Sequence, residues 1–155
     1  MIGYRLRPAT PDDSDILFRI HRASMGEYLE QAFGPWTDEF DREQHEQWLS
    51  AGRVQVVLVG DEIAGALDVE WTAEAALLYR IGIDPLFQGR GLGTAIVREL
   101  QRECGERSLP VRLHVFPPNP ARRLYQRLGF REVGRDGTSI MMQWDPPVRY
   151  GILLL

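Results

Sequence analysis

Lysine is absent from this chain of 155 residues, so all 18 of its basic residues are arginine. Cysteine is almost absent too. The single Cys104 excludes an internal disulfide framework and a cysteine-rich zinc site, and this fits a reducing, cytoplasmic compartment. No apolar stretch approaches the ~20 residues of a membrane span, and the N-terminus lacks a signal-peptide pattern. We therefore expect a cytoplasmic protein with no membrane partner.

The charges are unevenly distributed along the chain, although the formal net charge is only −4. Residues 11–80 contain 15 acidic residues and 5 arginines, whereas residues 88–135 contain 10 arginines and 4 acidic residues. Nucleic-acid binding is not expected, because a surface that neutralises phosphates would make the domain basic overall. The asymmetry instead predicts a small anionic ligand for the second segment and a cationic partner for the first.

Hydrophobic periodicity predicts one α/β domain over residues 1–155, with residues 146–155 as a C-terminal tail. Alternating or apolar runs predict seven strands, at residues 4–7, 54–59, 63–71, 76–83, 111–116, 131–133 and 140–144. Capping residues and helical spacing predict four helices, which start near residues 11, 38, 92 and 120. The first is expected to end in the mid-20s, and Asn119 is expected to be the N-cap of the last.

A glycine-rich turn between a strand and a helix carries the strongest chemical signal. The strand that ends at Ile83 runs through Asp84 into a loop with three glycines in five residues, and a helix follows at once. Glycine lets the backbone approach a ligand closely, and a helix start offers unpaired N–H groups, so this arrangement suits phosphate. The spacing does not match dinucleotide-binding or nucleotide-triphosphatase fingerprints.

Two ordered motifs follow each other along the chain. The first is the run Gln88-Gly89-Arg90-Gly91-Leu92-Gly93, and the second comprises Asn119-Pro120-Ala121, Tyr125 and Gly129-Phe130. They resemble the Q/R-x-x-G-x-G/A signature and the N-x-x-A/R-x-x-x-Y-x-x-x-G-F segment of the GNAT superfamily of acyl-CoA-dependent N-acetyltransferases. The resemblance implies an α+β fold: a mixed, mainly antiparallel sheet of about seven strands with about four helices, splayed near its middle for acetyl-CoA. It also implies direct acetyl transfer to a primary amine within a ternary complex.

By this resemblance, the glycine-rich loop and the strand before it bind the cofactor. Backbone N–H groups of the loop would hold the pyrophosphate, and the Arg90 guanidinium would add a charge-assisted contact. The backbone of Ile81 and Ile83 would pair with the pantetheine arm, and the backbone near Ile83 would polarise the thioester carbonyl. Asn119 would contact the pantetheine or sulfur region, act as a helix N-cap, or do both. The cofactor-binding residues expected are Ile81, Ile83, Gln88, Gly89, Arg90, Gly91, Leu92, Gly93, Thr94 and Asn119.

Tyr125 is the expected general acid, because a phenol at the sulfur can protonate the departing thiolate. Its position on the same helical face as Leu128 also fits simple packing. The base is less clear. Some relatives place a glutamate on the fourth strand where this chain has Leu77. Glu70 is the expected catalytic base, relaying a proton through water, while Asp68 shares its face. The remaining alternatives are Glu74, Glu30 and His45.

The acceptor is expected to meet residues 27–47, which combine seven acidic residues with Tyr28, Phe33, Trp36 and Phe40. Such a wall suits a cationic amine, and the same acids also fit a solvated helix face. The acceptor is expected to be a small amine, an amino acid, an antibiotic or a peptide N-terminus. An alternative function, a noncatalytic acyl-CoA-binding or sensing module, is favoured by Leu77, whereas Tyr125 favours the enzyme. No metal is expected. The apolar residues 151–155 are expected to cover the sheet, join a homodimer contact or fray.

Overall fold

The structure is a computed structural model that describes residues 2–35 and 37–148. Trp36 and most of the apolar C-terminal tail, which we expected in the acceptor wall and a dimer contact, lie outside these described residues. Within them, no helix is long and apolar enough to cross a membrane.

Strand β1 (Arg5–Pro8) and helix α1 (Ser14–Phe33) are joined by a short helical turn, Pro11–Asp13. Asp13 stabilises this turn, because it accepts a 2.8 Å bond from the Thr10 backbone N–H and two 2.8 Å bonds from Arg7. The prediction that the first helix ends in the mid-20s is wrong. Nothing after Ala23 breaks the helix until Gly34, whose φ of 92° ends it.

Helix α2 (Asp38–Ser50) leads to the strand pair β2 (Val54–Val59) and β3 (Glu62–Trp71). Strand β4 (Ala76–Ile83), a short turn (Pro85–Phe87), helix α3 (Leu92–Arg107) and strand β5 (Val111–Val115) follow. Helix α4 (Ala121–Arg127) then precedes strands β6 (Arg131–Asp136) and β7 (Ser139–Trp144). The predicted α+β class, with seven strands and four helices, is confirmed. The last hairpin is longer than predicted, because Gly137 (φ 59°) allows a tight turn.

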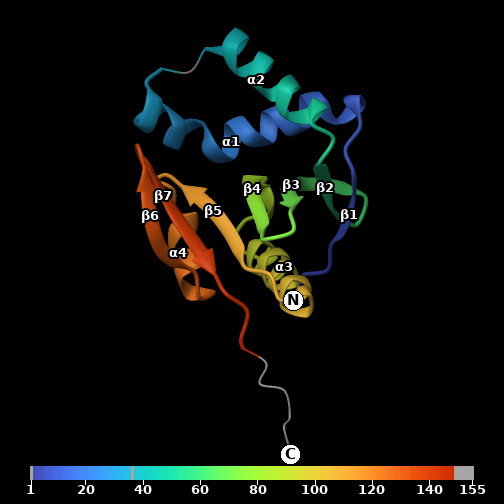
Figure 1. The fold of residues 1–155 in the computed structure, drawn as a ribbon. Helices are drawn as coiled ribbons and strands as arrows, with labels where there is room; N and C mark the ends of the chain where they lie inside the picture. The colour runs from blue at the N-terminus through green and yellow to red at the C-terminus, as the bar shows by residue number, and fades with distance from the viewer. Residues whose placement is uncertain (1, 36, 149–155) are drawn as a thin grey trace, which may run out of the picture.

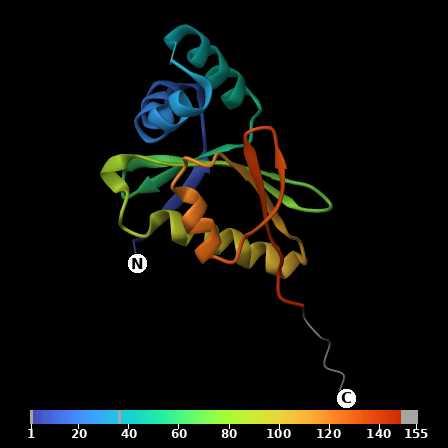
Figure 2. The ribbon, with the colours of Figure 1, turned by 90° about the vertical axis from the view of Figure 1, so that its left-hand side faces the viewer.

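The seven strands form one sheet in the order β1-β2-β3-β4-β5-β7-β6, in which only β4 and β5 run parallel. Helices α1 and α2 lie on one face of this sheet, and α3 and α4 lie on the other (Figures 1 and 2). The larger core lies under α3, whose residues Leu92, Ile96, Leu100 and Cys104 are all buried, as their four-residue spacing predicts.

The sheet opens between its two parallel strands. Strands β4 and β5 pair only over Ala76–Val111, Leu77–Arg112 and Leu78–Leu113. Beyond Leu78, strand β4 contains a bulge at Tyr79. Leu78 and Arg80 pair with the consecutive β3 residues Val69 and Asp68, so Tyr79 between them has no partner residue in the β3 register. No described residue pairs with the far half of β4, up to Ile83, on its β5 side. The predicted splay of the sheet therefore lies between β4 and β5.

Glycine is required where β3 crosses the end of β4. A Cβ atom on Gly65 would lie 2.0 Å from the backbone oxygen of Gly82, so the two strands would have to separate. We expect Gly65→Ala to lower the free energy of unfolding by about 1–3 kcal/mol, the usual cost of forcing atoms into packed space. Gly105→Ala in helix α3 is the matched control, because its new methyl meets open space and alanine favours helix. Urea unfolding of both variants tests this, and an unchanged midpoint for Gly65→Ala would contradict it.

Candidate active site

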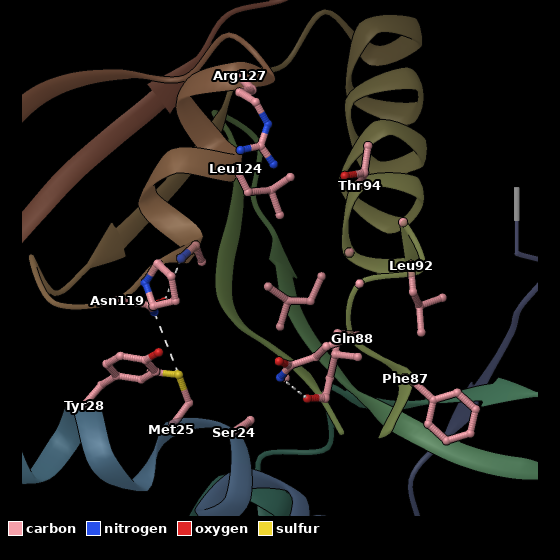
Figure 3. A pocket seen from close by; sticks show the side chains of 18 residues that line it. Ser24, Met25, Tyr28, Phe87, Gln88, Leu92, Thr94, Asn119, Leu124 and Arg127 are labelled. Carbon is pink, nitrogen blue, oxygen red and sulfur yellow. Dashed lines mark hydrogen bonds between the residues drawn. The ribbon is translucent and has the colours of Figure 1, made fainter. Parts of the chain in front are cut away.

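A cavity of about 510 Å³ lies at the open end of the sheet (Figure 3). Nine of the ten residues expected to bind the cofactor line this cavity, which we call the first cavity. Strand β4 supplies Ile81 and Ile83, the loop before α3 supplies Gln88 and its glycines, and Asn119 comes from the loop before α4. The sequence motifs, though far apart in the chain, therefore meet around one space.

The glycine-rich loop adopts a backbone that only glycine takes readily. Gly89 and Gly91 have φ angles of 77° and 78°, in the left-handed region, and a Cβ on either would meet no atom within 4 Å. Gly91 is the N-cap of α3, and its carbonyl accepts the first helical bond from Ala95 at 3.0 Å. The N–H groups of Leu92, Gly93 and Thr94 consequently have no partner within the helix. The loop thus offers several backbone donors and a positive helix end to an anion.

The exposed edge of β4 offers backbone groups to the gap. The Gly82 carbonyl lies toward β3, and the Asp84 N–H donates to Ala64 of β3 at 2.8 Å. Because strand residues alternate, the backbone groups of Ile81 and Ile83 point the other way, toward the gap. The Ile83 carbonyl accepts a 2.9 Å bond from the Gln88 side chain, drawn as a dashed line in Figure 3. The structure thus gives Gln88 an internal partner in this loop.

Arg90 is the expected cofactor residue that does not line the first cavity. Its guanidinium carbon lies 5.3 Å from the centre of the Phe87 ring. Arg127 of α4 lines the cavity instead, together with Ser24 and Met25 of α1 (Figure 3). Sequence analysis missed these three residues. The sequence signal for Arg127 is its place within the motif segment from Asn119 to Phe130. Ser24 and Met25 had no such signal, because the first helix is expected to end in the mid-20s.

A second cavity of about 190 Å³ lies between β4 and β5, and Met25, Ile81 and Asn119 line both cavities. Tyr125 lines the second cavity and is only 6% exposed. Its ring packs at 5.5 Å from that of Phe130, and no described residue forms a hydrogen bond with its hydroxyl. Burial raises the pKa of Tyr125 to about 12, so the phenol stays protonated at neutral pH.

Asn119 has local partners on both ends of its amide. Its Oδ1 accepts a 2.9 Å bond from the Ala121 N–H, and its Nδ2 lies 3.8 Å from the sulfur of Met25. The first turn of α4 begins one residue later than predicted, because Pro120 (φ −66°, ψ −16°) stands at the cap position. Asn119 therefore stabilises the helix start while it lines both cavities.

Glu70 lies directly opposite Leu77 in the β3–β4 ladder. Its carboxylate accepts a 2.7 Å bond from the Tyr79 hydroxyl, and Tyr79 lines the second cavity. Glu70 itself lines neither of the two cavities. The bond to Tyr79 is therefore the connection that the structure shows between Glu70 and the second cavity.

Two of the alternative bases are engaged in structural contacts. Asp68 is fully buried and accepts bonds of 2.9 and 3.1 Å from Arg53 and one of 2.7 Å from the Trp48 indole. His45 forms a 2.9 Å bond with the Ser14 carbonyl, and burial lowers its pKa. Both residues thus help to hold α1 and α2 on the sheet. Among the described residues, no three histidine, cysteine or acidic side chains are grouped to hold a metal ion.

Comparison with known proteins supports the assignment that the motifs and geometry suggest. The model of the acetyltransferase (GNAT) family matches residues 20–130, which include the glycine-rich loop, both cavities' strands and Tyr125. The chain belongs to the GNAT family. The region matched starts within α1 and ends at Phe130, so it contains the whole opened part of the sheet.

Two curated relatives of this chain are mycothiol acetyltransferases. That of Mycolicibacterium gilvum is 35% identical over 138 residues, 81% of this chain and 44% of the relative. That of Rhodococcus erythropolis is 33% identical over 131 residues, 77% of this chain and 43% of the relative. The chain therefore spans less than half the length of these relatives.

Solved GNAT structures share the fold over nearly the whole chain. PaiA N-acetyltransferase from Thermoplasma acidophilum, solved in complex with coenzyme A, superposes with a TM-score of 0.73 at 18% identity over 93% of this chain and 99% of that one. An acetyltransferase from Thermus thermophilus gives a TM-score of 0.73 at 26% identity, covering 93% of this chain and 97% of that one. These likenesses confirm the GNAT fold.

Proposed function

We propose that this chain transfers the acetyl group of acetyl-CoA to a primary amine. The observation that carries the proposal is that the two cavities adjoin, because Met25, Ile81 and Asn119 line both. The glycine-rich loop lies at the first cavity, the β4 edge runs along the gap, and Tyr125 lies in the second cavity. A long anionic thioester fits this order, because its phosphates need donors at one end and its sulfur needs an acid at the other.

Acetyl-CoA supplies an activated acyl group in this reaction. The backbone N–H groups at the start of α3 and the Arg127 side chain would hold its phosphates. The gap-facing backbone of Ile81 and Ile83 would pair with the amide groups of its arm. As the new C–N bond forms and the C–S bond breaks, the Tyr125 hydroxyl would give its proton to the sulfur. The proton lost by the amine would return to Tyr125 through solvent.

Before the attack, Glu70 would take one proton from the acceptor ammonium through water, with Tyr79 in between, and so produce the free amine. We expect Glu70→Gln to lower kcat/KM about 10- to 100-fold at pH 7, with a smaller loss as pH rises. The reason is that the free-amine fraction of the acceptor grows with pH and removes the need for a base. Steady-state rates between pH 6.5 and 10 test this expectation.

Glu74→Gln provides the control, because Glu74 is exposed and its backbone N–H, not its carboxylate, makes the local bond to Thr72. A Glu70→Gln loss that is the same at every pH would contradict the role of a base. The expected role of Glu70 would also be wrong if both variants kept the rate of the unchanged protein.

Release of free CoA thiol tests the proposed function directly. The protein is mixed with acetyl-CoA and a panel of small amines, amino acids, aminoglycoside-type antibiotics and peptides, and thiol and acetylated product are both measured. Equal amounts of thiol and N-acetyl product with at least one amine would support the proposal. Product should be absent when the amine is omitted, since thiol release alone would report hydrolysis.

A noncatalytic acyl-CoA-binding module is the second candidate. Leu77 favours it, because no carboxylate stands on β4 at that position and the nearest, Glu70, is held by Tyr79. Tight CoA binding without turnover across the amine panel would select this module over the enzyme.

A further inference from the structure

The second cavity is lined by a cation that has no ion-pair partner among the described residues. Arg80 of β4 lines this cavity, and its Nη1 atom is buried with no hydrogen-bond partner. No carboxylate of a described residue forms an ion pair with Arg80 within 4.0 Å. Its guanidinium carbon instead lies 4.1 Å from the centre of the Trp48 ring. A buried polar group without a partner is costly, and a ligand that enters the cavity would supply the missing hydrogen-bond acceptor.

The carboxylate nearest in the sheet is already used. Asp68 is the β3 partner of Arg80 in register, but both of its oxygens accept bonds from Arg53 and one also accepts from Trp48. Two guanidinium groups thus share one carboxylate in this buried region. Burial lowers the pKa of Arg80 to about 10, which still leaves the group charged at neutral pH.

The remaining polar neighbours do not neutralise Arg80. His21 of α1 lines the same cavity, and burial together with Arg80 lowers its pKa to about 3, so it is neutral. Glu70 lies two residues beyond Asp68 on β3, and its carboxylate accepts a hydrogen bond from the Tyr79 hydroxyl. The second cavity is therefore lined by the charged residue Arg80 and by the Tyr125 phenol.

We propose that the amine acceptor carries a carboxylate, which Arg80 binds in the second cavity, so that the substrate is a small amino acid or a molecule of the same chemistry. This inference rests on the proposed acetyl transfer. A guanidinium matches a carboxylate with two parallel N–H···O bonds, which orients the acceptor as well as binding it. The cavity volume of about 190 Å³ is below the ~300–1,000 Å³ of sites for drug-sized ligands, and so it favours a small acceptor.

The position of Arg80 also fits the reaction geometry. Ile81, the residue after Arg80, lines both cavities, and so does Asn119. A carboxylate held by Arg80 would place an amine one or two bonds away close to the junction, where the thioester end of the cofactor is expected. Arg80 is thus a specificity-determining residue for the acceptor, whereas the glycine-rich loop would bind the phosphates of the acyl donor.

Matched sets of acceptors test this assignment in the unchanged protein. Each set contains an amino acid, its C-terminal amide and the amine that lacks the carboxyl carbon, for example alanine, alaninamide and ethylamine. We expect kcat/KM for at least one amino acid to exceed that of its amide by tenfold or more. The comparison is stringent, because the amide has the less basic amino group. A larger fraction of it is therefore unprotonated at neutral pH, and this alone would favour the amide as acceptor.

Arg80→Met supplies the second arm, since methionine keeps an apolar stem against Trp48 and removes the charge. We expect the preference for the acid over the amide to fall to about one, mainly through a higher KM for the acid, with unchanged CoA affinity. Arg98→Met, at an exposed position on α3, should retain the full preference. If Arg80→Met fails to fold, the acceptor sets in the unchanged protein still decide the question.

The two proposals fail in different ways. Acetylation of amides and plain amines as fast as amino acids in every set would overturn the role of Arg80 and leave acetyl transfer intact. An absence of acetylated product with every amine, with CoA still bound, would overturn both.

Discussion

Gly91→Asp is expected to abolish CoA binding, with a loss of affinity of at least 100-fold. The new carboxylate would stand at the N-cap of α3, where the free N–H groups and the positive helix end are expected to meet phosphate. Its charge would repel the ligand, and its side chain would occupy the open space beside the loop. Isothermal titration with CoA measures the effect.

Two control variants separate charge from backbone strain. Gly52→Asp introduces the same residue at a φ of 78°, also with open space around it, but outside both cavities. It should cost a similar amount of stability and leave CoA affinity unchanged. Gly91→Asn has nearly the same shape as the aspartate variant without its charge, and asparagine tolerates the left-handed region. We expect an intermediate loss of affinity, and CoA binding by Gly91→Asp within threefold of the unchanged protein would refute the phosphate site.

Tyr125→Phe is expected to lower kcat about 100-fold or more while CoA affinity stays nearly constant. Phenylalanine keeps the ring that packs against Phe130 and removes only the hydroxyl, which has no hydrogen-bond partner among the described residues. The loss would therefore report chemistry and not packing. Tyr4→Phe is the control, since Tyr4 is half-buried in the core and lines neither cavity. Single-turnover rates with saturating acetyl-CoA give the measurement.

The pH dependence provides a second measure of the role of Tyr125. A tyrosine at its ordinary pKa of 10.0 would be half ionised at pH 10, whereas burial raises the pKa of Tyr125 to about 12. The protonated phenol is the active form, so ionisation of Tyr125 lowers the activity only as pH approaches 12. We expect kcat to show no decline between pH 7 and 10, and a fall centred near pH 10 would contradict the buried acid. An unaltered rate in Tyr125→Phe would exclude the acid role entirely.

Local patterns in the sequence are sufficient for most of the fold. The four-residue spacing from Leu92 to Cys104 predicts a buried helix face, and the apolar run from Val54 to Val59 predicts a strand; both are confirmed. The end of α1 was missed because Gly26 and several polar residues weaken the periodic signal, although none of them stops a helix. The Phe33 ring at the end of α1 packs 5.0 Å from the Phe116 ring, and sequence alone does not report this tertiary contact.

The candidate site also has a part that the sequence predicts and a part that depends on the fold. The glycine-rich loop and the Asn119 to Phe130 segment are continuous motifs, so the sequence predicts the residues around the first cavity. The environment of Arg80 depends on where three separate segments meet, because Trp48, Asp68 and Arg80 are brought together only by the fold. One signal was present: Arg80 is the sole charged residue in the strand from Ala76 to Ile83. A charge in such a strand indicates either a buried partner or a ligand.

The parallel alignment of β4 and β5 has a consequence for how acceptor specificity can change. These are the two strands whose carboxyl ends diverge, and each is followed by a loop and a helix, α3 and α4. The helices that follow both strands lie on the same face of the sheet (Figure 1), so the crevice here arises from the separation of the two strands beyond Leu78. The hydrogen-bonded ladders of the other strands lie outside this crevice. Acceptor preference can therefore diverge among such proteins through α1 and a few strand positions, while the scaffold that holds the acyl donor stays constant.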